Sequence, residues 1–186
     1  MCHTLLQDPK LYALLSRIDH EHAAEMRAAR CRCGGVLHSA RYPRKPRGGP
    51  AQLRQTYNCR LSFCCAQCRR RSTPMSVRYL GRRVYLATVV VLACAMRAGL
   101  TARRARQLSA ALSVPLRTLE RWRHWWLVDF VHTPFWRSVC GRFMPPVPVV
   151  SLPAGLLSRF TANDMATRLT QLLRFLAPLS TLTEAR

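Results

Sequence analysis

Residues 63–74 read FCCAQCRRRSTP, a cluster of cysteines that runs directly into three arginines. Cys65 and Cys68 have the C-x-x-C spacing of a zinc knuckle, a tight turn that points two thiolates at one ion. A redox-active C-x-x-C pair would need a strand-to-helix junction, but Cys68 is followed by RRRSTPMSVRYL, a strand-like run that contains Pro74. The spacing therefore favours one half of a metal site over a redox centre.

A second group of cysteines lies upstream, where residues 31–35 read CRCGG. Its C-x-C spacing is tighter than that of the usual knuckle, and its glycines permit a backbone turn beneath a metal. A long insert separates the two groups, but the entropy cost of closing a loop grows only logarithmically with its length. We expect a structural Zn²⁺ ion held by four thiolates, those of Cys31, Cys33, Cys65 and Cys68. Two other ligands are possible, since Cys64 could replace Cys65 and His38 could replace Cys31 or Cys33. A cysteine cluster that binds no metal is a further alternative.

The charge of the chain is strongly one-sided, because 30 lysine and arginine residues stand against 8 acidic ones and give a formal net charge of +22. Between Met26 and Leu119 there is no aspartate or glutamate at all. A GC-rich genome would explain the preference for arginine over lysine, but not the missing acids. The expected partner is therefore a polyanion, and we expect nucleic acid rather than an anionic membrane surface.

The start of the chain, MCHTLLQDPK, lacks the apolar segment of a signal peptide. The longest apolar run, at residues 84–96, is shorter than the roughly 20 residues that cross a bilayer, so it predicts a buried helix. We expect a cytoplasmic, nucleoid-associated protein. In that reducing compartment, the nine cysteines favour metal binding over disulfides.

The stretch ARQLSAALSVPLRTLERWRHWW, residues 105–126, predicts a helix-turn-helix. Leu108 and Leu112 are expected to face a core, and Ser109 is small enough for two helices to cross. The turn is Ser113-Val114-Pro115, since proline suits the first turn of the following helix. The second helix then carries its own apolar stripe, made of Leu119, Trp122 and Trp126. Its tryptophans, with Trp125, are expected to pack in the core rather than stack on bases.

Basic side chains on and around this motif are the expected DNA contacts. The early part of a recognition helix reaches base edges in the major groove, and Arg117 and Arg121 share one face there. The expected set on the motif is Arg117, Thr118, Arg121 and His124 on the second helix, with Arg103 and Arg104 across the DNA backbone. Outside the motif, the expected phosphate contacts are Arg69, Arg70 and Arg71 beside the knuckle, and Arg44, Lys45 and Arg47 in the basic insert at 41–50. An ordinary helical hairpin with a solvated basic face is the alternative.

These segments predict a small α+β fold, with β-strands expected at 36–42, 56–63 and 76–80. A helix is expected from residue 4, and helical structure again over 82–131. The expected segments are an N-terminal helix (1–30), a β-rich zinc-ribbon-like domain (31–80), an all-α helix-turn-helix bundle (81–143), and a proline-rich linker with a C-terminal helix (144–186).

The C-terminal helix is amphipathic, and Asn163 is its expected N-cap. Its apolar stripe consists of Met165, Leu169, Leu172, Leu173 and Leu176. Such a stripe is a candidate surface for recruiting a partner or for self-association.

In the order of its motifs, CRCGG, CCAQCRRRSTP and LSAALSVPLRTLERWRHWW, the chain resembles the DNA-binding portion of bacterial insertion-sequence transposases and related short mobile-element proteins. The resemblance covers roughly residues 31–130. It implies recognition of double-stranded DNA, at the ends of a mobile element or at a regulatory site. The alternatives are a non-catalytic regulatory or assembly module that recruits a transposase subunit or self-associates through its C-terminal helix, and a degenerate or RNA-binding zinc-ribbon protein.

The acidic residues do not favour catalysis by this chain. A two-metal nuclease site needs clustered carboxylates, and the strand-like segments between residues 31 and 80 carry none. The eight acids are Asp8, Asp19, Glu21, Glu25, Glu120, Asp129, Asp164 and Glu184. The sequence also has no phosphate loop of the G-x-x-x-x-G-K type. We therefore expect a protein that is not an enzyme.

Overall fold

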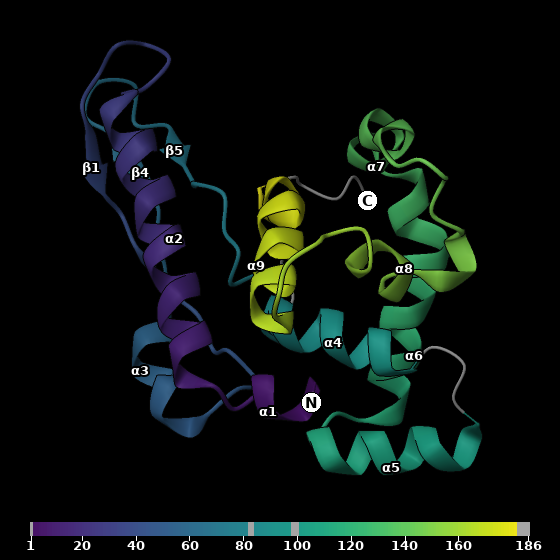
Figure 1. The fold of residues 1–186 in the computed structure, drawn as a ribbon. Helices are drawn as coiled ribbons and strands as arrows, with labels where there is room; N and C mark the ends of the chain where they lie inside the picture. Colours follow the sequence, from purple (N-terminus) through teal and green to yellow (C-terminus); the bar gives the residue numbers. More distant parts are fainter. Residues whose placement is uncertain (1, 82–83, 98–100, 182–186) are drawn as a thin grey trace. The chain divides into compact units, whose positions relative to one another are not determined.

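The computed structural model describes residues 2–81, 84–97 and 101–181. Its fold is mixed α+β, with helices before and after a few short antiparallel strands (Figure 1), which confirms the expected class. Residues 82–83 and 98–100 of the expected helical region, and the carboxylate of Glu184, lie outside the described residues. The chain forms two compact units, which we call the ribbon unit (His3–Ala87 with Leu173–Arg186) and the helical unit (Met1–Cys2 with Thr88–Leu172).

The N-terminal segment holds two helices rather than one, α1 (Cys2–Leu5) and α2 (Pro9–Ala28). Asp8 caps α2, because its carboxylate accepts a hydrogen bond from the N–H of Lys10 at 2.9 Å. Pro9 follows and has no N–H with which to continue an upstream helix. The prediction of one helix from residue 4 is therefore wrong at its start.

The strands of the ribbon unit are short: β1 (Leu37–Ser39), β2 (Tyr42–Pro43), β3 (Cys59–Arg60), β4 (Phe63–Cys65) and β5 (Arg71–Ser72). An antiparallel sheet has the order β1-β4-β5, and β2 pairs with β3 separately. The strand expected at 56–63 is broken, because α3 (Arg54–Tyr57), which follows a 3₁₀ turn (Ala51–Leu53), extends into its beginning. The strand expected at 76–80 does not form either, since Tyr79 makes only an isolated bridge to Leu86.

Helix α2 covers the three-stranded sheet (Figure 1). Ala23 on the helix packs with Leu37, Leu61 and Phe63 from the β-rich segment, and all four are buried. The expected segments 1–30 and 31–80 thus share one hydrophobic core.

A buried ion cluster explains why residues 76–80 are not a strand. Asp19 on α2 is 1% exposed and accepts hydrogen bonds from the Ser76 hydroxyl (2.5 Å), the Val77 N–H (2.8 Å) and the Arg78 Nε (2.6 Å). Arg60 is buried beside them, with its Nη1 3.9 Å from the same carboxylate. Desolvation lowers the pKa of Arg60, while Asp19 opposes that shift. The backbone at 76–78 is therefore shaped by a carboxylate rather than by a neighbouring strand.

The helical unit contains α4 (Ala87–Arg97), α5 (Ala102–Leu112), α6 (Leu116–His124), α7 (Pro134–Val139) and α8 (Ala154–Leu157). A π-helical turn (Trp125–Asp129) and 3₁₀ turns (Phe130–His132, Cys140–Arg142 and Val149–Ser151) connect or extend them. Residues 89–94 of α4 are all buried, as expected for a core helix. Among the described residues, no helix combines the length and apolar character needed to cross a membrane.

The last helix, α9 (Met165–Leu176), is followed by a 3₁₀ turn (Ala177–Ser180). Asp164 rather than the expected Asn163 caps it, because the Asp164 carboxylate accepts bonds from the N–H (2.8 Å) and hydroxyl (2.7 Å) of Thr167. The leucines of the predicted stripe, Leu169, Leu172, Leu173 and Leu176, are at most 1% exposed. Met165, the remaining residue of the stripe, is half-buried.

Candidate metal centre and nucleic-acid interface

Four cysteine sulfurs from two distant segments meet in the ribbon unit. The Sγ atoms of Cys31, Cys33, Cys65 and Cys68 all lie within 4.8 Å of one another. Two pairs join the two segments, with 3.4 Å between the sulfurs of Cys33 and Cys65 and 3.6 Å between those of Cys31 and Cys68. These distances are far beyond a disulfide bond of about 2.05 Å. They are close to the edge of about 3.8 Å of a tetrahedron with zinc–sulfur bonds of about 2.3 Å.

The upstream segment folds into a knuckle through its glycines. The N–H of Cys31 bonds to the carbonyl of Gly35 (3.0 Å), and the N–H of Gly34 bonds to that of Cys31 (2.8 Å). Gly34 has φ +83°, a conformation that favours glycine. At Gly35 the reason is space, because a Cβ there would lie 2.6 Å from the Cys65 Sγ.

The downstream knuckle is closed by its own backbone, since the N–H of Cys65 bonds to the Arg70 carbonyl (3.0 Å) and the N–H of Arg69 to the Cys65 carbonyl (3.2 Å). The backbone N–H of Cys68 is the main cause that lowers the pKa of Cys65 to about 6. The N–H of Arg70 lowers the pKa of Cys68, but the neighbouring thiols of Cys33, Cys31 and Cys65 together raise it to about 12. Backbone donors and neighbouring thiols thus shift the pKa values of these two cysteines in opposite directions.

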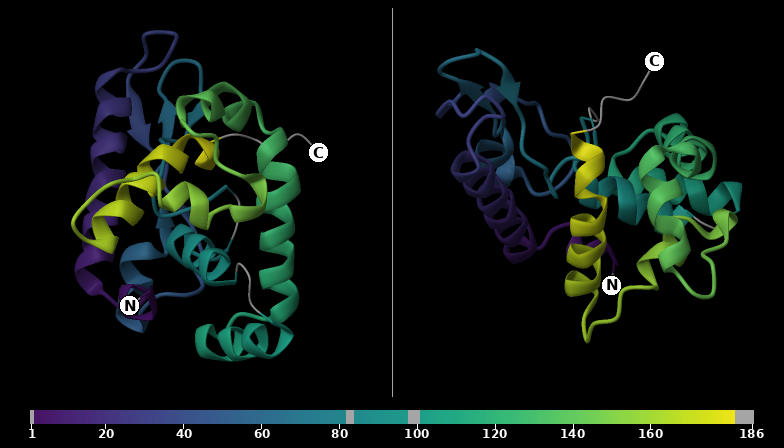
Figure 2. Two further views of the ribbon diagram at one scale, coloured as in Figure 1. Left: turned by 45° about the vertical axis from the view of Figure 1, so that its right-hand side comes forward. Right: turned by 90° about the horizontal axis from the view of Figure 1, so that it is seen from above.

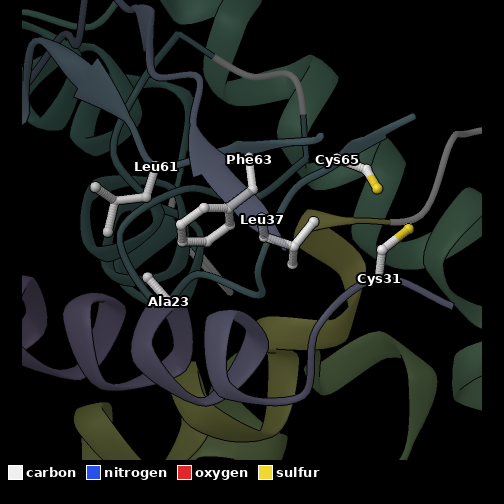
Figure 3. Packing of buried hydrophobic residues seen from close by; sticks show 6 residues of the cluster. All are labelled: Ala23, Cys31, Leu37, Leu61, Phe63 and Cys65. Carbon is white, nitrogen blue, oxygen red and sulfur yellow. The ribbon is translucent and has the colours of Figure 1, made fainter. Parts of the chain in front are cut away.

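One side of the cluster is buried, and the opposite side faces solvent. Cys31 and Cys65 are buried among the side chains under α2, and Figure 3 shows their sulfurs facing the same side. Cys33 and Cys68 are exposed. A site of four thiols, with no carboxylate or imidazole in the group, suits a structural metal ion. Among the described residues, these cysteines are the only group of three or more potential ligands.

The open question of substitute ligands is resolved by the sheet register. His38 on β1 lies opposite Cys64 on β4, and neither belongs to the sulfur cluster. Adjacent residues on a strand point to opposite faces, so Cys65 faces the sulfur cluster and Cys64 faces away from it. The four cysteines predicted as ligands are the ones that meet.

In the helical unit, α5 and α6 form the predicted helix-turn-helix, and Figure 2 shows the two helices running in different directions. Ser113 ends α5 in the left-handed region with φ 51°. The hydroxyl of Ser109 donates to the Val114 carbonyl at 2.6 Å, and the Val114 side chain is 1% exposed. The Ser109 hydroxyl and the buried Val114 side chain therefore fix the connection, and the turn lies at residues 113–115, where the sequence predicts it.

The packing of the two helices is uneven. The predicted stripe on α6 and the π-helical turn after it is buried, with Leu119, Trp122 and Trp126 at 0 to 2% exposure, and Trp125 is also buried. On α5 the expectation was less accurate, because Leu108 and Leu112 are only half-buried. Ala105 provides the fully buried contact of α5 instead.

Most of the basic residues predicted to contact DNA are exposed. They are Arg117, Arg121, His124, Arg103, Arg104, Arg69, Arg70, Arg71, Lys45 and Arg47. Thr118 is half-buried, as is Arg44, whose guanidinium lies 5.1 Å from the centre of the Tyr79 ring. The basic insert is ordered at Arg47, where the backbone bonds to Val84 and Leu86.

The Asp19 cluster is not among the predicted sites, although the sequence contains a signal for it. Asp19 follows Leu11 and Leu15 at intervals of eight and four residues, which places its carboxylate on the buried face of α2. An acid in register with an apolar stripe predicts a buried partner.

Comparisons with protein-family models, curated proteins and solved structures found no match for this chain.

Proposed function

We propose that this protein binds double-stranded DNA through α5 and α6, with α6 as the recognition helix. The observation that carries the proposal is the turn, in which the Ser109–Val114 hydrogen bond and the buried Val114 side chain hold two helices together. A turn fixed in this way presents the start of α6 rigidly, and that end of a recognition helix enters the major groove.

The exposed face of α6 has the chemistry to read base edges. Arg117 and Arg121 lie four residues apart and are both exposed, so their guanidinium groups can reach neighbouring positions in the groove. A guanidinium can donate two hydrogen bonds to the O6 and N7 atoms of guanine. Thr118 and His124 would add contacts beside them, and Arg103 and Arg104 on α5 would contact phosphates.

For the cysteine cluster, we propose Zn²⁺ as the ion. Zinc prefers four thiolates in a closed tetrahedral site, and the sulfur separations of 3.4 and 3.6 Å support such a site. The ion would connect two segments that are otherwise joined by short strands, so its role would be structural. Metal analysis of freshly purified chain should give one zinc per molecule, and a chain free of zinc would contradict this assignment.

The wider biological setting rests on the resemblance of the motifs alone. We propose a non-enzymatic protein of a mobile element, which recognises DNA and leaves strand chemistry to another protein. Recruitment of a transposase subunit by α9 is a weaker alternative, because the four leucines of its stripe are already buried.

Binding to nucleic acids of equal length tests the DNA proposal. The affinities of the full chain for a 30-base-pair DNA duplex and the matching RNA duplex would be measured by fluorescence anisotropy. Because the major groove of RNA is too deep and narrow for a helix, we expect tighter binding to DNA. Arg117→Ala with Arg121→Ala should remove that preference.

The matched control is Arg137→Ala with Arg142→Ala, which removes two exposed arginines of the helical unit outside the motif. Equal losses in the two double variants, or equal affinity for both duplexes, would contradict a recognition role for α6.

A further inference from the structure

The surroundings of the metal centre carry a charge pattern that the structural role of the metal does not require. Arg30 and Arg32 flank Cys31 in the upstream knuckle, and Arg69 and Arg70 follow Cys68 in the downstream one. All four side chains are exposed. The sulfurs of Cys31 and Cys68 are only 3.6 Å apart, so the fold brings the two arginine pairs to one place. We call these four arginines the knuckle rim.

The rim has no acidic partners among the described residues. None of its four arginines is in an ion pair there, and the exposed acids of α2 already have partners. Glu21 lies 3.8 Å from Arg17, and Glu25 lies 3.4 Å from His22. The positive charge of the rim is therefore left facing solvent.

The backbone at two rim positions favours glycine rather than arginine. Arg69 has φ 58° and directly follows the second cysteine of its knuckle. At the equivalent position of the other knuckle, after Cys33, the chain has Gly34 with φ +83°. Arg30 has φ 59° just after the end of α2, a position where helices most often place glycine. A left-handed conformation is unfavourable for arginine. The presence of arginine at both positions therefore indicates a role other than stability.

We infer that the knuckle rim, Arg30 and Arg32 with Arg69 and Arg70, is a phosphate-binding surface that holds the backbone of a nucleic acid independently of its sequence. The choice of DNA as that nucleic acid rests on the proposed function. The rim supplies guanidinium groups on a support fixed by four cysteines, so little chain entropy is lost when phosphate binds. The rival explanation is local, namely that the arginines only balance the negative charge of the thiolates.

The salt dependence of binding tests this inference with variants that should still fold. In Arg30→Gly with Arg69→Gly, both positions receive the residue that their backbone favours. The affinity of the full chain for a random-sequence 30-base-pair duplex would be measured at several salt concentrations. Each lost phosphate contact lowers the slope of log K against log salt by about 0.9. We therefore expect a slope lowered by roughly 0.9 to 1.8, with an unchanged or higher unfolding temperature.

Lys10→Gln with Arg17→Gln is the matched control, because it removes two exposed cations of the same unit. Lys10 lies near the other end of α2, about 30 Å along the helix from the rim. For this control variant, the slope of log K against log salt should stay near that of the unsubstituted chain. Equal slopes for the rim variant and this control would overturn the inference, as would a rim variant that loses metal affinity but keeps its slope.

A second comparison separates this inference from the proposed function. If Arg117→Ala with Arg121→Ala has no effect on DNA binding while the rim variant lowers the slope, the recognition-helix proposal fails and the rim stands. If the rim variant has no effect while the α6 variant loses the preference for DNA, the rim inference alone fails. A lowered slope with duplex RNA but not with duplex DNA would overturn the assignment of DNA as the partner.

Discussion

Replacing Gly35 with alanine tests how closely the two knuckles fit each other. A Cβ at this position would lie 2.6 Å from the Cys65 Sγ and 3.1 Å from the Gln67 Oε1. Non-bonded heavy atoms prefer separations of roughly 3.5 Å or more, so the sulfur or the turn has to move by about 0.9 Å. A zinc–sulfur distance tolerates only about 0.2 Å. Cys65 therefore cannot remain an undistorted ligand in Gly35→Ala.

The magnitude follows from the cost of overpacking, which is typically about 1–3 kcal/mol. That free energy corresponds to metal binding weakened about 5- to 150-fold. Competition with a coloured chelator would measure the affinity, and the visible spectrum of the Co²⁺-substituted chain would report the coordination geometry. We expect both to change in Gly35→Ala.

Two other glycines provide the controls. At Gly34 a Cβ would meet nothing within 4 Å, but φ is +83°, so Gly34→Ala should lower stability without changing the Co²⁺ spectrum. At Gly141 a Cβ also meets nothing within 4 Å and the backbone is not left-handed, so Gly141→Ala should have no effect on the metal centre. An unchanged affinity and spectrum in Gly35→Ala would refute the fit of the knuckles described above.

Three further predictions concern the fold itself. Asp19→Asn leaves the buried guanidiniums of Arg60 and Arg78 without their carboxylate and should cost about 3–5 kcal/mol in urea unfolding; a loss below about 1 kcal/mol would mean that the cluster contributes little. Ser113→Gly relieves a left-handed residue with φ 51° and should stabilise the helical unit by up to about 1 kcal/mol, whereas Ser113→Val should destabilise it; the reverse order of unfolding temperatures would contradict the turn. Burial raises the pKa of Tyr57 far above its usual range, so its contribution to stability is present below about pH 10 and is lost as the pH rises above that value. Between pH 8 and 11, the unfolding temperature should therefore fall less steeply in Tyr57→Phe than in the unsubstituted chain. Equally steep falls in the two proteins would show that Tyr57 does not contribute to the pH dependence of stability.

The parts of the fold that the sequence predicts well are those determined by local spacing. The C-x-x-C pair at Cys65 and Cys68 and the glycines after Cys33 identify turns that close within a few residues. The same holds for the turn at residues 113–115, where a small residue and a proline occupy fixed positions. Such signals need no knowledge of distant partners, so the four sulfurs and the two helices are found where they were predicted.

The errors arise where a distant residue decides the local structure. Residues 76–80 alternate like a strand, but Asp19, far upstream, binds their backbone and side chains instead. The stripe of α9 identifies an apolar face, but the sequence does not tell whether that face is covered by the chain or by a partner. The start of α2 is a different case, because Asp8 and Pro9 form a local capping signal, which the prediction of one helix from residue 4 overlooks.

The most direct test of DNA recognition is selection of preferred sequences from a random duplex library by the full chain. With α6 as the recognition helix, one sequence should be enriched, and its affinity should exceed that of a scrambled duplex. In Arg117→Ala with Arg121→Ala the ratio of the two affinities should fall toward one, while Arg137→Ala with Arg142→Ala should keep it. A library without enrichment, or the same ratio in both double variants, would contradict recognition of DNA by this helix.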